Sequence, residues 1–354
     1  MARLAPPPRL LWRRPRLLLA GGLLAGLGAL SAAAGFLASG GHEELLSRWL
    51  PPPAGARARA PAASLPPAGA FPLRPTPPDC GPGAPFLLVL VASAAGHAEQ
   101  RQAVRRSWGA ARWAGGGAVR TLFVLGLPAD AALQAGLEEE ARRHGDLVQG
   151  RFQDTYANLT LKTLALLGWA AGQCPAARFV VKADDDVFLN LPALARHLAA
   201  LARPRGTYLG RVHWRVRPER DPSSRHHVPA ALYPPDVFPP YCSGTTYVLS
   251  GDTVAALLAV APSVPLVPVE DVFVGLCAQQ AGIAPLHVAR MAGAAHFPLD
   301  LCCYQEVLYS VHSVAPSEML DVWQRARGQE EVCSPWQRTF GILRCRILAW
   351  LAAT

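Results

Sequence analysis

The sequence predicts an α/β domain with a parallel sheet, because short apolar runs alternate with helix-like segments along its first half. The strand-like runs are rich in β-branched and aromatic residues and are bounded by polar ones. No GxGxxG follows the first run, so the dinucleotide-binding fingerprint is absent. In chain order we expect strand 86–91, helix 98–108, strand 121–125, helix 131–143, helix 158–172 and strand 179–181.

The N-terminus predicts a single membrane anchor. Arginines cluster before residue 17, and residues 17–41 carry no charge. About 20 apolar residues span a hydrocarbon core, and arginines in front of them keep the N-terminus cytoplasmic. We therefore expect a cytoplasmic tail at 1–16 and a signal-anchor helix at 17–38. A cleaved signal peptide is the alternative, since small residues at 31–34 would suit cleavage.

Composition separates a stem from a globular part. Residues 39–84 are rich in proline and small residues and predict an extended, semi-rigid stem. Residues 85–354 would then form the luminal domain of a type II membrane protein. The net charge is +9, but residues 1–84 hold nine arginines and three acids, so the remainder is nearly neutral. With no basic stripe on that remainder, we exclude nucleic acid as a partner.

Three consecutive carboxylates, Asp184, Asp185 and Asp186, follow the strand at 179–181. In open α/β sheets, ligands bind at the carboxyl ends of the strands. Hard oxygen donors suit Mg²⁺ or Mn²⁺ together with substrate phosphates. The alternative is a solvated acidic turn. Apolar residues on both sides of the acids favour a site.

The second half is less regular. We expect a strand near 208–214, a turn at 243–247, an Asp-capped helix at 252–260 and two acids, Glu270 and Asp271, before a helical run. Asn158 begins a glycosylation sequon. The eight cysteines contain no CxxC pair and fit disulfides in a secretory protein, although their pairing cannot be read from the sequence.

Seven stretches, taken in order, resemble the β1,3-galactosyltransferase family (glycosyltransferase family 31). They span residues 86–320 and read RQAVRRSW, FQDTYANLTLKTL, FVVKADDDVF, YLGRV, FPPYCSGTTYVLS, VEDVFVG and VHSVAPSEM. The details YLGRVHWRV, HFPLDLCCY and GILRCRILAWL are most similar to the ganglioside-synthesising branch of that family.

The resemblance implies a GT-A fold of Rossmann-like type in the lumen of the Golgi, anchored to the Golgi membrane. It implies inverting transfer of galactose from UDP-galactose to the 3-hydroxyl of a terminal N-acetylgalactosamine on a ganglio-series glycolipid. A β1,3-N-acetylglucosaminyltransferase of the same family is one alternative, because the shared motifs do not fix the donor sugar. A catalytically inactive, membrane-anchored sugar-binding protein is an alternative of another class.

The resemblance also implies roles for the acids and one histidine. Asp184 and Asp186 would hold Mn²⁺, with Mg²⁺ as the alternative, and His312 matches the C-terminal metal ligand of the family. His296 is a weaker candidate ligand. Asp271 matches the catalytic base that removes the acceptor proton, and Glu270 beside it is the rival base, a helix cap or an acceptor contact.

The remaining roles concern the two substrates. On the donor side the resemblance implies Arg101, Arg105, Trp108, Lys182 and Asp185, with Asp184 turned to the ribose as another option. The sugar platforms and polar contacts expected on the acceptor side are Trp214, Tyr241, Ser243 and Gly244. Thr246 stands where the family often has a second glycine, which puts the acceptor contacts of this segment in doubt.

Overall fold

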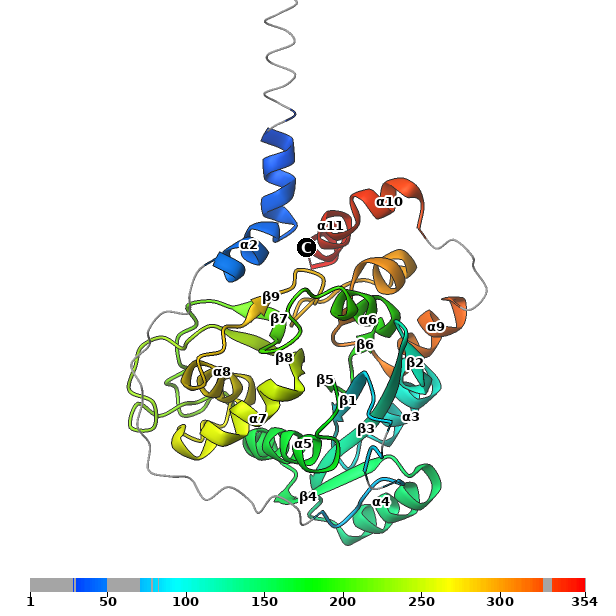
Figure 1. Cartoon of the computed structure of the whole chain (residues 1–354), viewed down its shortest axis with the longest axis vertical. Helices are drawn as coiled ribbons and strands as arrows, with labels where there is room; N and C mark the ends of the chain where they lie inside the picture. Colours follow the sequence, from blue (N-terminus) through cyan, green and yellow to red (C-terminus); the bar gives the residue numbers. More distant parts are fainter. Residues whose placement is uncertain are drawn as a thin grey trace, which may run out of the picture.

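The computed structural model describes residues 28, 30–49, 71–77, 79–81, 83–326 and 333–353. A mixed α/β fold is built on a central sheet, with strand order β2-β3-β1-β5-β8-β7-β9 and β4 paired to β3 (Figure 1). The strands are β1 Leu87–Ala92, β2 Trp113–Ala114, β3 Gly117–Leu127, β4 Leu147–Gln153, β5 Phe179–Asp184, β7 Tyr208–His213, β8 Tyr241–Ser250 and β9 Leu286–His287. A separate antiparallel pair joins β6 Phe188–Leu189 to β10 Ser310–Val311.

The sheet is parallel in one half and antiparallel in the other. Strands β4, β3, β1 and β5 run parallel. The sequence predicts this arrangement for β1, β3 and β5, whereas β4 was not expected. Strand β8 runs antiparallel to both β5 and β7, so the expectation of a parallel sheet is wrong for the second half. An irregular loop of residues 214–240 leads from β7 to β8. The turn expected at 243–247 lies inside β8 and is also wrong.

Helices cover both faces of the sheet. Strand β1 shows why, because alternate side chains enter two different apolar clusters: Leu87 and Val89 join one, Leu88 and Leu90 the other. A strand buried on both faces reads as a continuous apolar run. One face is covered by α3 Ala98–Arg106, α4 Ala131–His144, α6 Leu191–Ala199, α9 Pro316–Ala326 and α11 Gly341–Ala353. The other face is covered by α5 Leu159–Gln173, α7 Gly251–Val260 and α8 Glu270–Gln280.

The N-terminal region differs from the extended stem expected at 39–84. A helix, α2 (Gly41–Trp49), occupies its start. Residues 71–81 contact the domain, since the backbone N–H of Gln149 donates to Leu73 O at 3.1 Å. Residues 17–27 of the expected anchor lie outside the described residues, and 30–38 are helical. Within the described ranges, no helix has the length and apolar character needed to cross a bilayer.

Disulfides join six of the eight cysteines. The pairs are Cys80–Cys174, Cys302–Cys333 and Cys303–Cys345. The first ties the segment before β1 to the end of α5, and the third ties α11 to the residues before β10. Cys242 and Cys277 are buried thiols within the core. The short helix α10 (Pro335–Thr339) precedes α11.

Candidate active site

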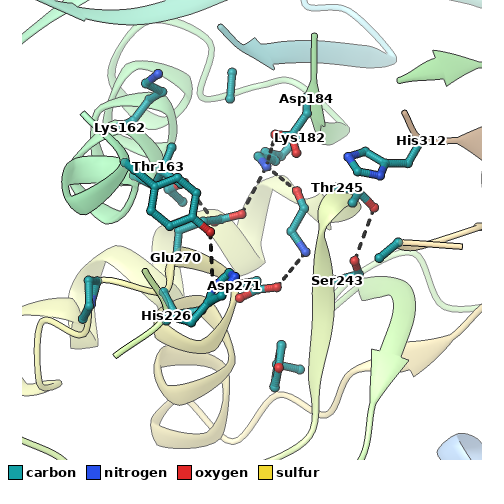
Figure 2. A pocket seen from close by; sticks show the side chains of 18 of the residues that line it. Lys162, Thr163, Lys182, Asp184, His226, Ser243, Thr245, Glu270, Asp271 and His312 are labelled. Atoms are coloured by element: carbon teal, nitrogen blue, oxygen red, sulfur yellow. Dashed lines mark hydrogen bonds and ion pairs between the residues drawn. The ribbon is translucent and has the colours of Figure 1, made fainter. Parts of the chain in front are cut away.

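A cavity of about 400 Å³ lies where β1 and β5 end and α8 begins (Figure 2). Both strands run parallel, so their carboxyl ends open at the same edge of the sheet. Many of the residues predicted from the sequence line this cavity: Lys182, Asp184, Tyr241, Ser243, Gly244, Glu270, Asp271 and His312. Asp184 is the last residue of β5 and lines this cavity. Its role in binding a ligand stays a prediction.

Asp184, Asp186 and His312 form a cluster with metal-ligand geometry. One ligand atom from each lies within 4.8 Å of the others. The pairing of β6 with β10 brings His312 to the acids, and the backbone N–H of Val314 donates to Asp186 O at 2.9 Å. Asp186 Oδ1 is buried and has no hydrogen-bond partner. A buried carboxylate oxygen without a donor fits a bound cation, so these residues suit a divalent ion.

The charge of the cluster also favours a cation. His312 Nε2 lies 3.4 Å from Asp186 Oδ2. Burial raises the pKa of Asp186 above its ordinary value, the neighbouring Asp184 and Asp185 add to this effect, and His312 opposes it. A divalent ion would remove the repulsion among these carboxylates. His296 is exposed and lies outside this cluster.

Lys182 is the buried cation of the site. Its Nζ lies 2.6 Å from Asp184 Oδ1 and 3.1 Å from Glu270 Oε1, and it also donates to the carbonyl oxygen of Gly244. Burial lowers the pKa of Lys182, but the carboxylates of Asp184 and Glu270 outweigh burial and hold that pKa above its ordinary value. Lys182 therefore stays charged and fixes the position of Asp184.

The two acids at the start of α8 have different surroundings. Glu270 is buried, and its Oε2 accepts from Thr163 Oγ1 at 2.9 Å and from the Tyr247 hydroxyl at 3.3 Å. Burial raises the pKa of Glu270 to about 7, against the effect of the Lys182 ammonium. Oε2 is thus held by two hydroxyl groups, and the buried Oε1 lies 3.1 Å from the Lys182 ammonium without a hydrogen-bond partner. These contacts favour a structural role for Glu270.

Asp271 lies nearer the cavity and is held by backbone donors. Its Oδ2 accepts from the N–H of Gly244 at 2.9 Å, and its Oδ1 accepts from the N–H of Val272 at 2.9 Å. Burial raises the pKa of Asp271 above its ordinary value, while these N–H groups and Lys182 act against burial. A fixed carboxylate with a raised pKa suits a general base.

Gly244 has no room for a side chain. A Cβ at this position would lie 2.6 Å from Glu270 Oε1 and 3.3 Å from Asp271 Oδ2. Gly244→Ala is therefore expected to displace both acids and lower the rate of sugar transfer by about 100-fold. Gly136→Ala is the control, because a Cβ there meets nothing within 4 Å. Equal initial rates for the two variants would contradict the prediction.

Lys182→Met is expected to destabilise the fold, because it leaves Asp184 and Glu270 without their cation. Removing one partner of a buried ion pair costs about 3–5 kcal/mol of unfolding free energy. The measurement is the thermal unfolding midpoint of the full chain. Adding Glu270→Gln to this variant removes one stranded charge and should recover part of the loss. A single variant as stable as the wild type would show that Lys182 is not needed to balance these acids.

Three residues expected on the donor side do not line this cavity. Arg101 and Arg105 both pair with Glu140 of α4, at 2.7 and 2.6 Å, and Arg105 also pairs with Asp146. Trp108 is buried, and its Nε1 donates to Val187 O at 2.9 Å. The two arginines therefore join α3 to α4, and the tryptophan holds the segment that follows the acids.

Asp185 and Trp214 also lie away from the cavity. Asp185 Oδ2 accepts from Ser93 Oγ at 2.6 Å and lies 2.9 Å from His97 Nδ1. The hydrogen bond between His97 and Asp185 raises the pKa of His97, although burial of the imidazole acts to lower it. Asp185 thus ties the acidic segment to the end of β1. Trp214 packs at the edge of the core, whereas Tyr241 faces the cavity beside His213, with ring centroids 5.2 Å apart.

Asn158 precedes α5, and its Nδ2 donates to Gln153 O at 2.9 Å. Glycosylation of Asn158 remains a prediction.

Further residues of the cavity were not singled out from the sequence. Tyr156 and Lys162 belong to the stretch FQDTYANLTLKTL, so that stretch carried a signal for them. Lys162 Nζ lies 2.7 Å from Asp154 Oδ1 and donates to Ser93 O. Arg225 and His226 come from the irregular loop before β8 and reach the rim at Tyr156. No pattern in that loop predicts their position.

A second cavity of about 360 Å³ adjoins the first. His213 and Ala294 line both cavities. The walls of the second cavity are mostly apolar, with two arginines, and its other residues include Arg211, Met291, Phe297, Arg346 and Ala349.

Comparison with known proteins places the chain among sugar transferases. A family model described as "Galactosyltransferase" matches residues 99–289, which include the acids of the cavity and end before His312. Beta-1,3-galactosyltransferase 4 of Rattus norvegicus is 45% identical over 350 residues, covering 88% of this chain and 93% of that protein. The Homo sapiens protein of the same name is 43% identical and covers 77% and 82%. A Homo sapiens acetylgalactosaminyl-O-glycosyl-glycoprotein beta-1,3-N-acetylglucosaminyltransferase is 41% identical and covers 72% and 69%.

Proposed function

The chain belongs to the β1,3-galactosyltransferase family, and we propose that it transfers galactose from UDP-galactose to the 3-hydroxyl of a terminal N-acetylgalactosamine on a ganglio-series glycolipid. The observation that carries this proposal is one cavity that holds both Asp271 and a metal-type cluster with Asp184. Similarity to proteins named beta-1,3-galactosyltransferase 4 over most of the chain supports the donor and the linkage.

The donor side of the proposal rests on the cluster of Asp184, Asp186 and His312. A divalent ion held there, Mn²⁺ with Mg²⁺ as the alternative, would neutralise the charge that develops on the departing diphosphate. Lys182 holds Asp184 in place through their 2.6 Å ion pair. Lys162 adds a second cation to the lining of the cavity.

The acceptor side rests on Asp271. Its carboxylate takes the proton of the acceptor 3-hydroxyl as that oxygen bonds to the anomeric carbon of galactose. The bond from this carbon to the UDP oxygen breaks at the same time, and UDP leaves with the electron pair. Attack on the face opposite UDP inverts the configuration in one displacement. Backbone N–H groups of Gly244 and Val272 fix the two oxygens of the base.

The test is an assay of the full chain in detergent with Mn²⁺. The acceptors are a ganglio-series glycolipid that ends in N-acetylgalactosamine and the same oligosaccharide without its lipid. We expect β1,3-linked galactose on the glycolipid from UDP-galactose. No transfer to either acceptor, from a folded protein that binds UDP, would contradict the proposed activity.

A β1,3-N-acetylglucosaminyltransferase is the second candidate, favoured by the 41% identity to a relative whose name states that activity. The same assay with UDP-N-acetylglucosamine separates the two candidates. Transfer from this donor alone would replace galactose in the proposal and leave the assignment of the base and the cluster unchanged.

We propose a single-pass type II placement in the Golgi membrane, with the catalytic domain in the lumen. The anchor expected at 17–38 supports it, as do three disulfides, which form in the oxidising secretory pathway. In cells, an N-glycosidase should increase the gel mobility of the chain, and Asn158→Gln should abolish that change. A chain accessible to protease added outside intact Golgi vesicles would contradict this orientation.

A further inference from the structure

Helix α2 packs its polar side on the catalytic domain and turns its apolar side outward. Ser47 Oγ accepts from the backbone N–H of His287 at 3.0 Å, and Glu44 Oε1 accepts from that of Ala289 at 2.7 Å. A surface helix in water normally buries its apolar face. In α2 the large apolar side chains are the exposed ones: Leu45, Leu46 and Trp49, the last 82% exposed.

Helices α10 and α11, at the other end of the chain, also expose large apolar side chains. Trp336 and Phe340 are exposed, and their rings stack at 6.0 Å with an interplanar angle of 2°. Ile347 and Trp350 are exposed on α11. Neither helix contains an acidic residue. Within the part of the chain that the structure describes, no element covers these aromatic side chains.

These helices lie at one end of the molecule, next to residues 30–38 (Figure 1). Arg346 of α11 donates from Nη1 to Ala38 O at 3.1 Å. The Cys303–Cys345 disulfide fixes α11 to the catalytic domain. We use the term apolar face for the exposed residues Leu45, Leu46, Trp49, Trp336, Phe340, Ile347 and Trp350. Trp113 and Leu133 are also exposed, but they lie on β2 and α4.

We propose that the apolar face rests on the surface of a lipid bilayer, so that the catalytic domain lies against the membrane and is not held away from it by a stem. Tryptophan prefers the interface between headgroups and acyl chains, and this face carries three. Exposed large apolar side chains that gather at one end of a molecule are typical of a protein or membrane contact.

The continuity of the chain favours a bilayer over another protein. Residues 30–38 contact α11 and lead back to the uncharged stretch 17–27, which the sequence places in the membrane. An anchor that leaves the bilayer beside α2 and α11 would hold these helices at the surface of the bilayer.

This orientation places the second cavity next to the membrane. Arg346 and Ala349 of α11 line that cavity, on the helix that carries Trp350. A lipid-linked acceptor in the same bilayer would then extend its sugars from the surface through the second cavity toward Asp271.

The test uses the full chain in nanodiscs that contain phosphatidylcholine with a photoactivatable diazirine on its acyl chain. After irradiation, lipid adducts are located by peptide mass spectrometry. We expect adducts on residues 335–351 and 41–49 in addition to the expected anchor. Adducts confined to residues before 39 would overturn the proposal. Lipid labelling needs no sugar transfer, so this experiment tests the membrane contact independently of the proposed activity.

A matched pair of variants sharpens the result. Trp336→Ser combined with Phe340→Ser and Trp350→Ser should lose most lipid adducts on 335–351. Trp113→Ser, which removes a tryptophan 67% exposed on β2, should leave these adducts unchanged. Three results together would assign the apolar face to a second copy of the chain and overturn the proposal. The wild type would be a dimer by light scattering, the triple variant would be a monomer, and the wild type would carry no lipid adducts at residues 335–351.

Discussion

Asp271→Asn is expected to lower the rate of galactose transfer by about 10²–10⁴-fold, because an amide cannot accept the proton of the acceptor hydroxyl. The amide keeps nearly the same shape, although its single oxygen can accept from only one of the N–H groups of Gly244 and Val272. Position 271 also lies outside the metal-type cluster of Asp184, Asp186 and His312. Calorimetric binding of UDP with Mn²⁺ should therefore be unchanged. The comparison of single-turnover rates between the variant and the wild type gives the size of the effect.

Glu270→Gln is the matched control for this prediction. Glu270 lines the cavity but is more deeply buried than Asp271, and its Oε2 already accepts from Thr163 and Tyr247. We expect a smaller loss of rate than for Asp271→Asn. A variant of Asp271 with the wild-type rate, beside an inactive variant of Glu270, would show that the assignment of the base is wrong.

The same assignment fixes the sign of the pH dependence. The base works only when deprotonated, so the rate should fall as the pH falls through the pKa of Asp271. Burial raises that pKa, and the fall should begin at a higher pH than for an ordinary aspartate. The measurement is kcat/KM against pH for the wild type. A rate that stays constant down to the ordinary range of aspartate would contradict a raised pKa at the base.

Removal of divalent metal by EDTA is expected to lower transfer by at least about 100-fold, since neutralising the charge on a leaving diphosphate contributes several kcal/mol to catalysis. Added Mn²⁺ should restore the rate of the wild type. It should not restore Asp186→Ala, which lacks the carboxylate whose buried oxygen has no hydrogen-bond partner.

Two histidine variants complete the metal test. His312→Ala should weaken activation by Mn²⁺, because His312 belongs to the cluster with Asp184 and Asp186. His296→Ala should behave like the wild type, because that side chain is exposed and outside the cluster. Full activity after EDTA treatment would exclude a metal-dependent mechanism. If the chain transfers no sugar and its affinity for UDP does not depend on Mn²⁺, the non-catalytic sugar-binding alternative would be favoured.

The parallel half of the fold was predictable because its signal is local. Strands β1, β3 and β5 contain apolar runs, and helices close by in sequence precede or follow them. Strand β4 is less apolar, and the sequence did not predict it. The position of Asp184 at the end of β5 follows from the same local pattern. Chain order also places Glu270 and Asp271 at the start of a helix, as expected.

Distant pairings were not predictable from local patterns. His312 reaches the acids through two-residue strands, β6 and β10, which carry no periodic signal, so only the family resemblance pointed to it. Arg101 and Arg105 find their partner, Glu140, on another helix, and a motif that names the arginines does not name this partner. The docking of α2 likewise depends on backbone N–H groups near β9.

His213 and Ala294, which line both cavities, bear on which substrates the protein prefers. A single sugar bound at Asp271 would leave the adjoining space filled with water, whereas an oligosaccharide could occupy both spaces, so the length of the acceptor chain becomes a criterion of selection. If enzyme and acceptor share one leaflet, they meet by lateral diffusion in two dimensions. Turnover would then follow the number of acceptor molecules per unit area, and dilution of the surrounding solution would leave it unchanged.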